Sequence, residues 1–419
     1  MTDASSKTPT VNPALWEPRY AARAARMQAS EIRELLKLLD QPDIISFAGG
    51  IPDPALFPVE AVSKAYLDVL SDKAQASRVL QYSISEGDPA LRAWIVDHMA
   101  SRGVTCAPGN ILITNGSQQA LEFLGRLLLS PKDTALVEAP TYLGALQAFS
   151  SNEPRYDTLH LGQTNRTPDS YRQAALDAGG DVKFAYVVPD FANPSGETLP
   201  LDGRRDLLAL AMDLDIPIIE DAAYAALRYD GVDLAPLQAL DIASTGSINA
   251  SRVIYCGTFS KTLTPGLRIG WICASEQLIA RLILIKQASD LNSAAINQAV
   301  LLRLAETLYD EQVSKARIHY RAKRDAMLAA LEKYMPDGVS WTQPDGGLFV
   351  WVTLPPDINT SELLKRAVSE ARVAFVPGHA FFADGTGTNT MRLSFSLPDI
   401  ESITQGVHRL SELIRNDPT

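Results

Sequence analysis

Short apolar runs alternate with helical segments between about residues 110 and 275 of the chain. The runs are apolar on both faces, which is typical of strands in a parallel sheet covered by helices on both sides. Segments between them, such as QQALEFLGRLLL and RRDLLALAMDL, have helical periodicity. We therefore predict an α/β fold with a mainly parallel sheet, whose strands lie at 111–114, 135–139, 184–189, 217–221, 253–257 and 269–274.

Two further regions flank this alternating part. After Ser30, apolar residues at i, i+3, i+4 and i+7 predict an amphipathic helix that carries Arg33 on its polar side. On the other flank, a helical region at about 276–335 precedes a smaller α+β set. That set consists of FVWVTL, a helix after Thr360, VAFVP, MRLSF and a C-terminal helix from about Asp399.

The composition narrows the class of protein. A length of 419 residues fits two or three domains, and 46% hydrophobic with 21% charged residues excludes a disordered or fibrous chain. A formal net charge of -11 without a basic run argues against nucleic acid or an anionic membrane as a partner. Three cysteines in unrelated stretches and a polar N-terminus without an apolar signal segment predict a cytoplasmic protein.

Polar residues follow several of the predicted strands, where α/β sheets bind their ligands. Lys261 comes directly after the run VIYCG and is preceded by the hydroxyl residues Thr258 and Ser260. Most lysines lie on solvated helix faces, so a lysine at a strand end is a candidate for chemistry. The alternative is an ordinary lysine on a surface loop.

Asp221 is the last residue of the run PIIED. A carboxylate buried at a strand end needs a cationic partner, such as a metal, an arginine or a protonated cofactor nitrogen. The five histidines are scattered and none has helical metal-ligand spacing, so we predict no metal site. The alternative for Asp221 is a helix N-cap.

The turn Asn115-Gly116-Ser117-Gln118-Gln119 lies between a predicted strand and a helix that begins near Ala120. Small residues at such a turn let backbone N–H groups and the helix dipole attract an anion. Arg268, seven residues after Lys261, adds a charge-assisted donor for a phosphate. The turn alone is weak evidence, because many strand-to-helix turns bind nothing.

A lysine for imine formation, an acid for a pyridine nitrogen and a phosphate site are together what pyridoxal 5'-phosphate (PLP) requires of a protein. With these residues the chain resembles the class I/II, fold-type I PLP-dependent aminotransferases, above all the 2-aminoadipate and kynurenine/2-aminoadipate group. The resemblance spans nearly the whole chain. Its motifs are SEIRELLKLL, SFAGGIPDPALFP, LQYSISEGDPALR, TNGSQQAL, VEAPTYLGALQAF, PDFANPSGETL, EDAAYAAL, GTFSKTLTPGLRIGW, PDGGLFVW and NTMRLSFS.

The resemblance implies a role for each matching residue. Lys261 forms the imine with PLP and moves the proton, Asp221 pairs with the ring nitrogen, and Asn193 and Tyr224 bond to the ring hydroxyl. Tyr142 stacks on the ring. The phosphate is held by Ser117, Gln118, Thr258 or Ser260, Arg268 and, from the partner subunit of a homodimer, Tyr82. The substrate α-carboxylate binds Arg392, with help from Asn193 and the backbone around Gly50.

Residues 1–18 are rich in Ser, Thr and Pro without periodicity, so we expect a loose arm there. For the rest of the chain we expect an N-terminal helix segment at 19–48 that joins the small domain, a large PLP-binding domain at 49–305 and a small α+β domain at 306–419. By periodicity Arg33 is a solvated surface residue. By resemblance its helix approaches the pocket, so that Arg33 binds the distal carboxylate of an acidic substrate.

We therefore expect an enzyme of amino-acid metabolism, a transaminase with ping-pong kinetics. Its donors would be 2-aminoadipate, glutamate, and aromatic or aliphatic L-amino acids, and its acceptor a 2-oxo acid such as 2-oxoglutarate. A carbon–sulfur β-lyase with the same cofactor remains an alternative, because only the pocket decides the fate of the shared carbanion. A transcription-regulator effector module is a further alternative, but fewer than 50 residues precede SFAGG, which leaves no room for a winged-helix DNA reader.

Overall fold

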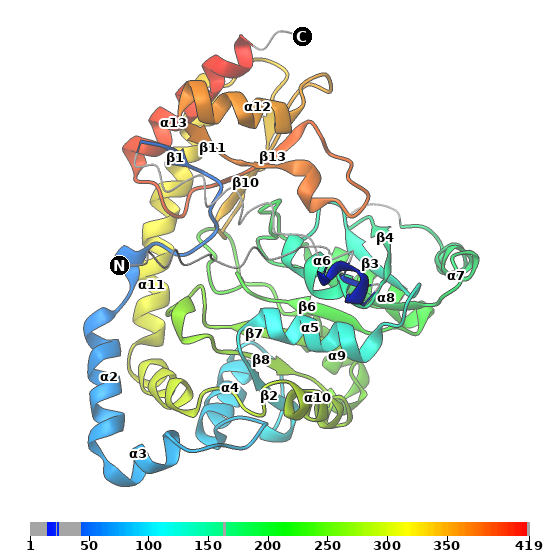
Figure 1. Cartoon of the computed structure of the whole chain (residues 1–419), viewed down its shortest axis with the longest axis vertical. Coiled ribbons are helices and arrows are strands. Elements are labelled where there is room, and N and C mark those ends of the chain that lie inside the picture. The colour runs from blue at the N-terminus through cyan, green and yellow to red at the C-terminus, as the bar shows by residue number, and fades with distance from the viewer. Residues whose placement is uncertain (1–14, 22, 25–42, 162–164, 417–419) are drawn as a thin grey trace, which may run out of the picture.

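The computed structural model describes residues 15–21, 23, 24, 43–161 and 165–416 (Figure 1). A seven-stranded sheet has the order β2-β8-β7-β6-β5-β3-β4. Strands β3 to β7 pair in parallel, and only β8 runs antiparallel to its neighbours β2 and β7. The predicted mainly parallel sheet is therefore confirmed. Its strands are β2 (Ile111–Thr114), β3 (Thr134–Glu138), β4 (Arg155–Leu159), β5 (Val182–Val187), β6 (Ile218–Asp221), β7 (Val253–Thr258) and β8 (Gly270–Cys273).

Helices cover both faces of this sheet, because neighbouring residues of each strand point to opposite sides. Leu112 and Ile254 pack in one apolar cluster with α5 (Ser117–Leu128), α6 (Leu143–Ser150) and α10 (Glu276–Ser289). Ile113 and Tyr255 belong to a second cluster, on the opposite face, with α4 (Pro89–Ser101) and α9 (Leu237–Thr245). A third cluster packs α7 (Pro168–Asp177) and α8 (Leu201–Leu214) on the sheet.

A smaller four-stranded antiparallel sheet has the order β12-β13-β10-β9. Its strands are β9 (Ser340–Trp341), β10 (Phe349–Thr353), β12 (Val376–Pro377) and β13 (Thr390–Ser394). Beside it, β1 (Ile45–Ser46) pairs in parallel with β11 (Val373–Ala374), and α12 (Thr360–Arg366) and α13 (Ile400–Arg415) pack nearby. The predicted α+β part is thus present.

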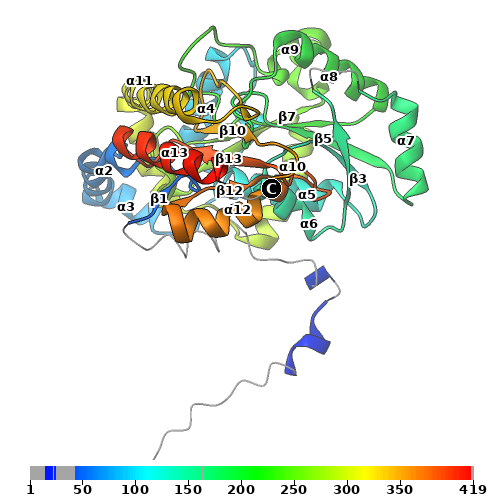
Figure 2. The same ribbon diagram turned by 90° about the horizontal axis from the view of Figure 1, so that it is seen from above.

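One long helix, α11 (Ala295–Tyr334), runs from the large sheet to the small one (Figure 1). It contacts α2 (Val59–Ser71), α3 (Lys73–Val79) and α4 at one end and α13 at the other. The predicted boundary at residue 305 falls inside α11 and stays a prediction. Figure 2 shows α2 and α3 at one end of the molecule and α7 at the opposite end.

Two details differ from the sequence prediction. The strand β4 was not predicted, because its residues RYDTL lie at the sheet edge and lack an apolar run. The helical region at 276–335 is divided between Ser289 and Ala295, where Leu291 has a left-handed backbone with φ 64°. The helix predicted after Ser30, with Arg33, lies outside the described residues. None of the described helices combines the length and apolarity needed to cross a membrane.

Candidate active site

A cavity of about 550 Å³ lies at the carboxyl ends of β5, β6 and β7, against the small sheet. Asp221 is the last residue of β6, Thr258 the last of β7, and Arg392 enters from β13. The parallel sheet thus brings together residues that are far apart in sequence. The predicted site residues that line this cavity are Gly50, Ser117, Gln118, Tyr142, Asn193, Asp221, Tyr224, Thr258, Ser260, Lys261, Arg268 and Arg392.

Asp221 is a buried carboxyl group with one satisfied oxygen and one free oxygen. Its Oδ2 accepts a hydrogen bond of 2.9 Å from the Tyr186 hydroxyl, whereas the buried Oδ1 has no partner. Burial raises the pKa of Asp221 to about 6, against the opposing effects of Tyr186, the Ala223 backbone N–H and Lys261. No helix begins after Asp221, because residues 223–226 form a turn, so the N-cap alternative is wrong.

The preceding carboxylate, Glu220, points to the other face of the sheet. Its two oxygens accept hydrogen bonds of 3.0 Å from the backbone N–H groups of Leu237 and Gln238, at the start of α9. Strand alternation therefore gives the two acids different surroundings. Only Asp221 lines the cavity.

Lys261 is half-buried and is not a surface-loop lysine. Its Nζ donates a hydrogen bond of 2.8 Å to the Gly50 carbonyl and lies 5.6 Å from the centre of the Tyr224 ring. Burial, together with the positive charges of Arg392 and Arg268, lowers the pKa of Lys261 to about 8. A lysine with this pKa is partly neutral near neutral pH, which an amine needs to act as a nucleophile or base.

The turn between β2 and α5 forms a concave, positively charged corner of the cavity. Helix α5 begins at Ser117, three residues before the predicted start, so its first N–H groups belong to Ser117 and Gln118. The guanidinium of Arg268 lies against Gly116 and donates a hydrogen bond of 3.2 Å to the Asn115 carbonyl. A Cβ atom on Gly116, where φ is 77°, would lie 2.6 Å from Arg268 Nη2, so only glycine fits this corner.

Arg392 is 2% exposed and bonds to neutral groups. Its Nη1 donates to Asn193 Oδ1 at 2.8 Å, and its Nη2 donates to the carbonyls of Ala48 and Gly49 at 2.8 and 2.9 Å. Its buried Nε has no partner. No carboxylate of the described residues forms an ion pair with Arg392, so its charge is available to an anion that enters the cavity.

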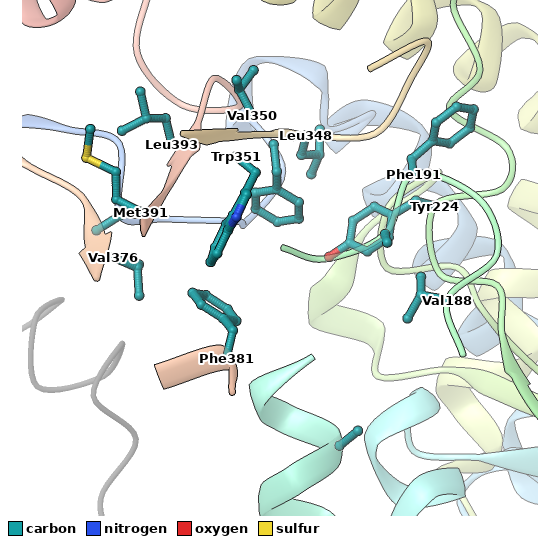
Figure 3. Close-up of a cluster of buried hydrophobic side chains, with 14 of the residues drawn as sticks. Val188, Phe191, Tyr224, Leu348, Val350, Trp351, Val376, Phe381, Met391 and Leu393 are labelled. Carbon is teal, nitrogen blue, oxygen red and sulfur yellow. The ribbon is translucent and has the colours of Figure 1, made fainter. Parts of the chain in front are cut away.

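Asn193 and Tyr224 connect the two sides of the cavity. Asn193 bonds to Tyr224 as well as to Arg392, and the Tyr224 ring meets Phe349 of the small sheet edge-on, with centroids 5.6 Å apart. Figure 3 shows Tyr224 beside Val188 and Phe191, facing the side chains that extend from β10. Burial raises the pKa of Tyr224 above the usual range of tyrosine, so its hydroxyl stays protonated.

Sequence reasoning missed two groups that hold site residues, and one predicted site residue does not line the cavity. Tyr186 was overlooked because it stands in an apolar run, although a buried tyrosine hydroxyl requires a partner. The Gly144 carbonyl, which accepts a hydrogen bond of 2.7 Å from Gln118 Nε2, carries no sequence pattern. Tyr82 is 80% exposed and does not line the cavity. Arg33 lies outside the described residues.

The residues present fit PLP. An unpartnered carboxylate oxygen on Asp221 suits a protonated ring nitrogen, and the lowered pKa of Lys261 suits bonding to an aldehyde. The corner at Gly116, with helix N–H groups and a guanidinium, suits a phosphate. All three lie along one cavity.

Known proteins share this architecture over most of the chain. Aromatic-amino-acid aminotransferase 1 of Thermococcus litoralis is 42% identical over 96% of this chain and 95% of its own. The crystal structure of the kynurenine aminotransferase of Pyrococcus horikoshii, in complex with PMP, has a TM-score of 0.88 and 40% identity, over 96% of this chain and 98% of that one.

A third relative carries a cofactor conjugate. The α-aminoadipate aminotransferase LysN of Thermus thermophilus, solved with N-(5'-phosphopyridoxyl)-L-leucine, has a TM-score of 0.85 and 38% identity, over 96% of this chain and 98% of that one. These similarities support transamination and not the β-lyase alternative. The model of the family "Aminotransferase class I and II" matches residues 42–410. The chain therefore belongs to the class I and II aminotransferases, enzymes that use PLP to transfer amino groups.

Proposed function

We propose that this enzyme transfers the amino group of an L-amino acid to a 2-oxo acid such as 2-oxoglutarate, and that its donors include 2-aminoadipate, glutamate, and aromatic and aliphatic amino acids. The observation that carries the proposal is that Lys261, Asp221 and Arg392 line one cavity. The amine of Lys261, the unpartnered carboxylate oxygen of Asp221 and the buried guanidinium of Arg392 can therefore all act on molecules bound in this cavity. The names of the three relatives support the range of donors.

The residues that would hold the cofactor all come from the part of the chain that builds the large sheet. Asp221 would pair with the ring nitrogen through its free Oδ1, and Asn193 and Tyr224 would bond to the ring hydroxyl. Tyr142, the N-cap residue of α6, would lie against the ring. The phosphate would be bound by Ser117, Gln118, Thr258 or Ser260, and Arg268.

The chain's own residues then move one proton. When bound, PLP supplies a carbonyl carbon that bonds to amines and a ring that draws electrons from the substrate's α carbon. Lys261 Nζ takes the α-proton, for which its lowered pKa leaves a neutral fraction. Asp221, when ionised, would stabilise the positive charge on the ring nitrogen. The amino group would stay with the bound cofactor and water would supply the oxo oxygen, so that the donor would leave as a 2-oxo acid before the acceptor binds. This order gives ping-pong kinetics.

Arg392 binds the α-carboxylate of both substrates. Its planar guanidinium suits a carboxylate, and the rings of Phe349 and Phe381 lie 4.3 and 5.1 Å from its central carbon. Asn193 and the backbone around Gly50 fix its orientation, since they hold Nη1 and Nη2. The Nε atom without a partner is a donor for the carboxylate.

The active enzyme is a homodimer with shared sites, in which Tyr82 reaches the phosphate of the neighbouring subunit. The support is that Tyr82 is 80% exposed, and that α2 and the segment after α3 carry other exposed apolar residues, such as Leu67 and Leu80. Exposed apolar residues of this kind mark an association surface. A cytoplasmic location remains part of the proposal.

Mixed dimers of Tyr82→Ala and Lys261→Ala subunits should recover activity that neither variant has alone. One of the two sites in such a dimer contains native Lys261 from one subunit and native Tyr82 from the other. The measurement is the transamination rate after subunit exchange, with hybrid formation verified by differently tagged chains. Verified hybrids without recovered activity would place Tyr82 in its own subunit's site or outside any site.

A screen of amino donors against 2-oxoglutarate tests the function itself. We expect glutamate, 2-aminoadipate, leucine and aromatic donors to react.

We further expect Arg33→Ala to slow the half-reactions of the acidic donors by about tenfold or more, because a charge-assisted contact contributes roughly 1.5–3 kcal/mol. Leucine and aromatic donors should be nearly unaffected. An equal loss for all donors would contradict the role of Arg33, whereas no reaction with any donor would contradict the proposed function.

A further inference from the structure

We propose that the buried Lys286 and the half-buried Asp290, behind the turn between β2 and α5, are positioning residues for the cofactor phosphate. This proposal rests on the placement of that phosphate at Ser117, Gln118 and Arg268. Neither Lys286 nor Asp290 lines the cavity, so they act through the residues they hold. The effect expected of them is on binding of the phosphate group and not on the chemistry at Lys261.

Lys286 is fully buried in α10, and its ammonium has a complete set of acceptors. Its Nζ lies 3.1 Å from both carboxylate oxygens of Asp290, 3.1 Å from Gln119 Oε1 and 3.0 Å from Ser293 Oγ. A buried lysine without such partners would be costly. Here helix α5 and the stretch that follows α10 are both tied to one charged group.

Asp290 and Gln119 pass this order on to Asn115. Asp290 Oδ2 accepts hydrogen bonds of 2.6 Å from Asn115 Nδ2 and 2.9 Å from Gln119 Nε2. Gln119 Oε1, which also accepts from Lys286, accepts a bond of 2.9 Å from the backbone N–H of Asn115. Residues 116–118 form the phosphate corner, and the network fixes Asn115 just before them and Gln119 just after them.

The Asn115 carbonyl connects this network to Arg268. It accepts the hydrogen bond of 3.2 Å from Arg268 Nη2, and the guanidinium lies against Gly116. A shift of Asn115 would move both the N–H groups of the turn and the acceptor that orients Arg268. Two parts of the phosphate site thus depend on one ion pair, whose lysine is buried and whose aspartate is half-buried.

Stability alone is a poor explanation of this pair. Desolvation offsets most of the attraction in a buried ion pair, and replacing both charges with apolar residues of similar volume is often neutral or stabilising. Charge-assisted hydrogen bonds, in contrast, fix direction as well as distance. The pair gives Asn115 and Gln119 a rigid set of partners that apolar residues would not provide.

The test compares PLP with pyridoxal, which lacks the phosphate. Apoenzyme is titrated with each compound, and binding is followed by quenching of tryptophan fluorescence, so activity is not the readout. In the double variant Lys286→Met/Asp290→Leu, which leaves no unpaired charge, we expect the Kd for PLP to rise by about 10–100-fold, as when partners of metal ligands are removed. The Kd for pyridoxal should stay within about twofold, well below the tenfold that 1.4 kcal/mol represents.

Two control variants separate the possible outcomes. Lys323→Met/Asp53→Leu removes another pair of a buried lysine and a half-buried aspartate, with Nζ and Oδ2 2.6 Å apart, and should leave the ratio of the two Kd values unchanged. Arg268→Gln should raise the Kd for PLP and leave the Kd for pyridoxal unchanged.

The ratio of the two Kd values decides between the outcomes. If the Lys286→Met/Asp290→Leu variant folds and its ratio is unchanged, whereas the ratio of Arg268→Gln is changed, the proposal is overturned. An unchanged ratio in Arg268→Gln would overturn the phosphate placement instead. If the double variant does not fold, Asn115→Ala, which removes the side-chain link to Asp290, provides the same comparison.

Discussion

Replacing Lys261 with alanine should lower the transamination rate by about 10²–10⁴-fold, the range for loss of a positioned proton-transfer group. The absorbance band that belongs to the imine of the holoenzyme should also be lost, because the bond from Nζ to the cofactor no longer forms. The purified variant should still contain PLP, since the phosphate corner and Asp221 are unchanged. Rate, visible absorbance and PLP content after denaturation measure these three outcomes.

The matched control is Lys365→Ala, which removes a lysine whose side chain is 71% exposed and which pairs with Glu362 on the surface. This control should keep the native rate and absorbance band, because surface ion pairs contribute little. A native rate in Lys261→Ala would show that another group moves the proton, and the assignment of Lys261 would be wrong.

Asp221→Asn should reduce kcat/KM by about 10²–10³-fold, equivalent to about 2.7–4 kcal/mol, as for loss of one preorganised electrostatic partner. The amide keeps an acceptor for the Tyr186 hydroxyl but has no charge to hold the proton on the ring nitrogen. Steady-state kinetics with saturating PLP measure this loss. Activity within a factor of a few of native would contradict the role of Asp221.

Asp221→Asn should also change how the stability of the apoenzyme depends on pH. The pKa of Asp221 is raised from 3.8 to about 6, so its favourable contribution to folding is present at low pH and is lost as the pH rises through about 6. Asparagine does not ionise. Thermal denaturation of the apoenzymes should therefore favour the variant over the native protein more at pH 8 than at pH 5. The opposite trend would mean that Asp221 has a cationic partner before PLP binds.

The sequence pattern predicted best those strands that helices cover on both faces of the sheet. The apolar runs ending at Asp221 and Thr258 are central strands, covered on both faces, so their pattern was clear and the residues after them were found. The strand Arg155–Leu159 lies at the edge, where most of its side chains are only partly buried, and it was missed. Local periodicity gives no information on the partners of a group. The bond from Tyr186 to Asp221 and the network around Lys286 depend on how strands and helices pack, and only the structure revealed them.

Some site residues could be selected from the sequence pattern itself, and others only through the family resemblance. Lys261, Asp221 and Arg268 could be selected from their positions after strands, because a charged group there needs a reason. Arg392 and Tyr142 stood out only through the resemblance, since an arginine in an apolar strand is equally consistent with a local ion pair. Local pattern could not select the carbonyls of Ala48 and Gly49 as partners of Arg392, because they are backbone groups of residues about 340 positions away; only the resemblance pointed to this stretch and to Asn193.

The most direct test of the account is a half-reaction without an acceptor. Holoenzyme is mixed with an excess of glutamate or cysteine conjugate, and 2-oxo acid and ammonia are quantified over time. We predict one equivalent of 2-oxoglutarate per subunit from glutamate, no free ammonia, and further turnover only after a second 2-oxo acid is added. Continuous release of pyruvate and ammonia from the cysteine conjugate, without any acceptor, would contradict the assignment of this cavity to amino-group transfer.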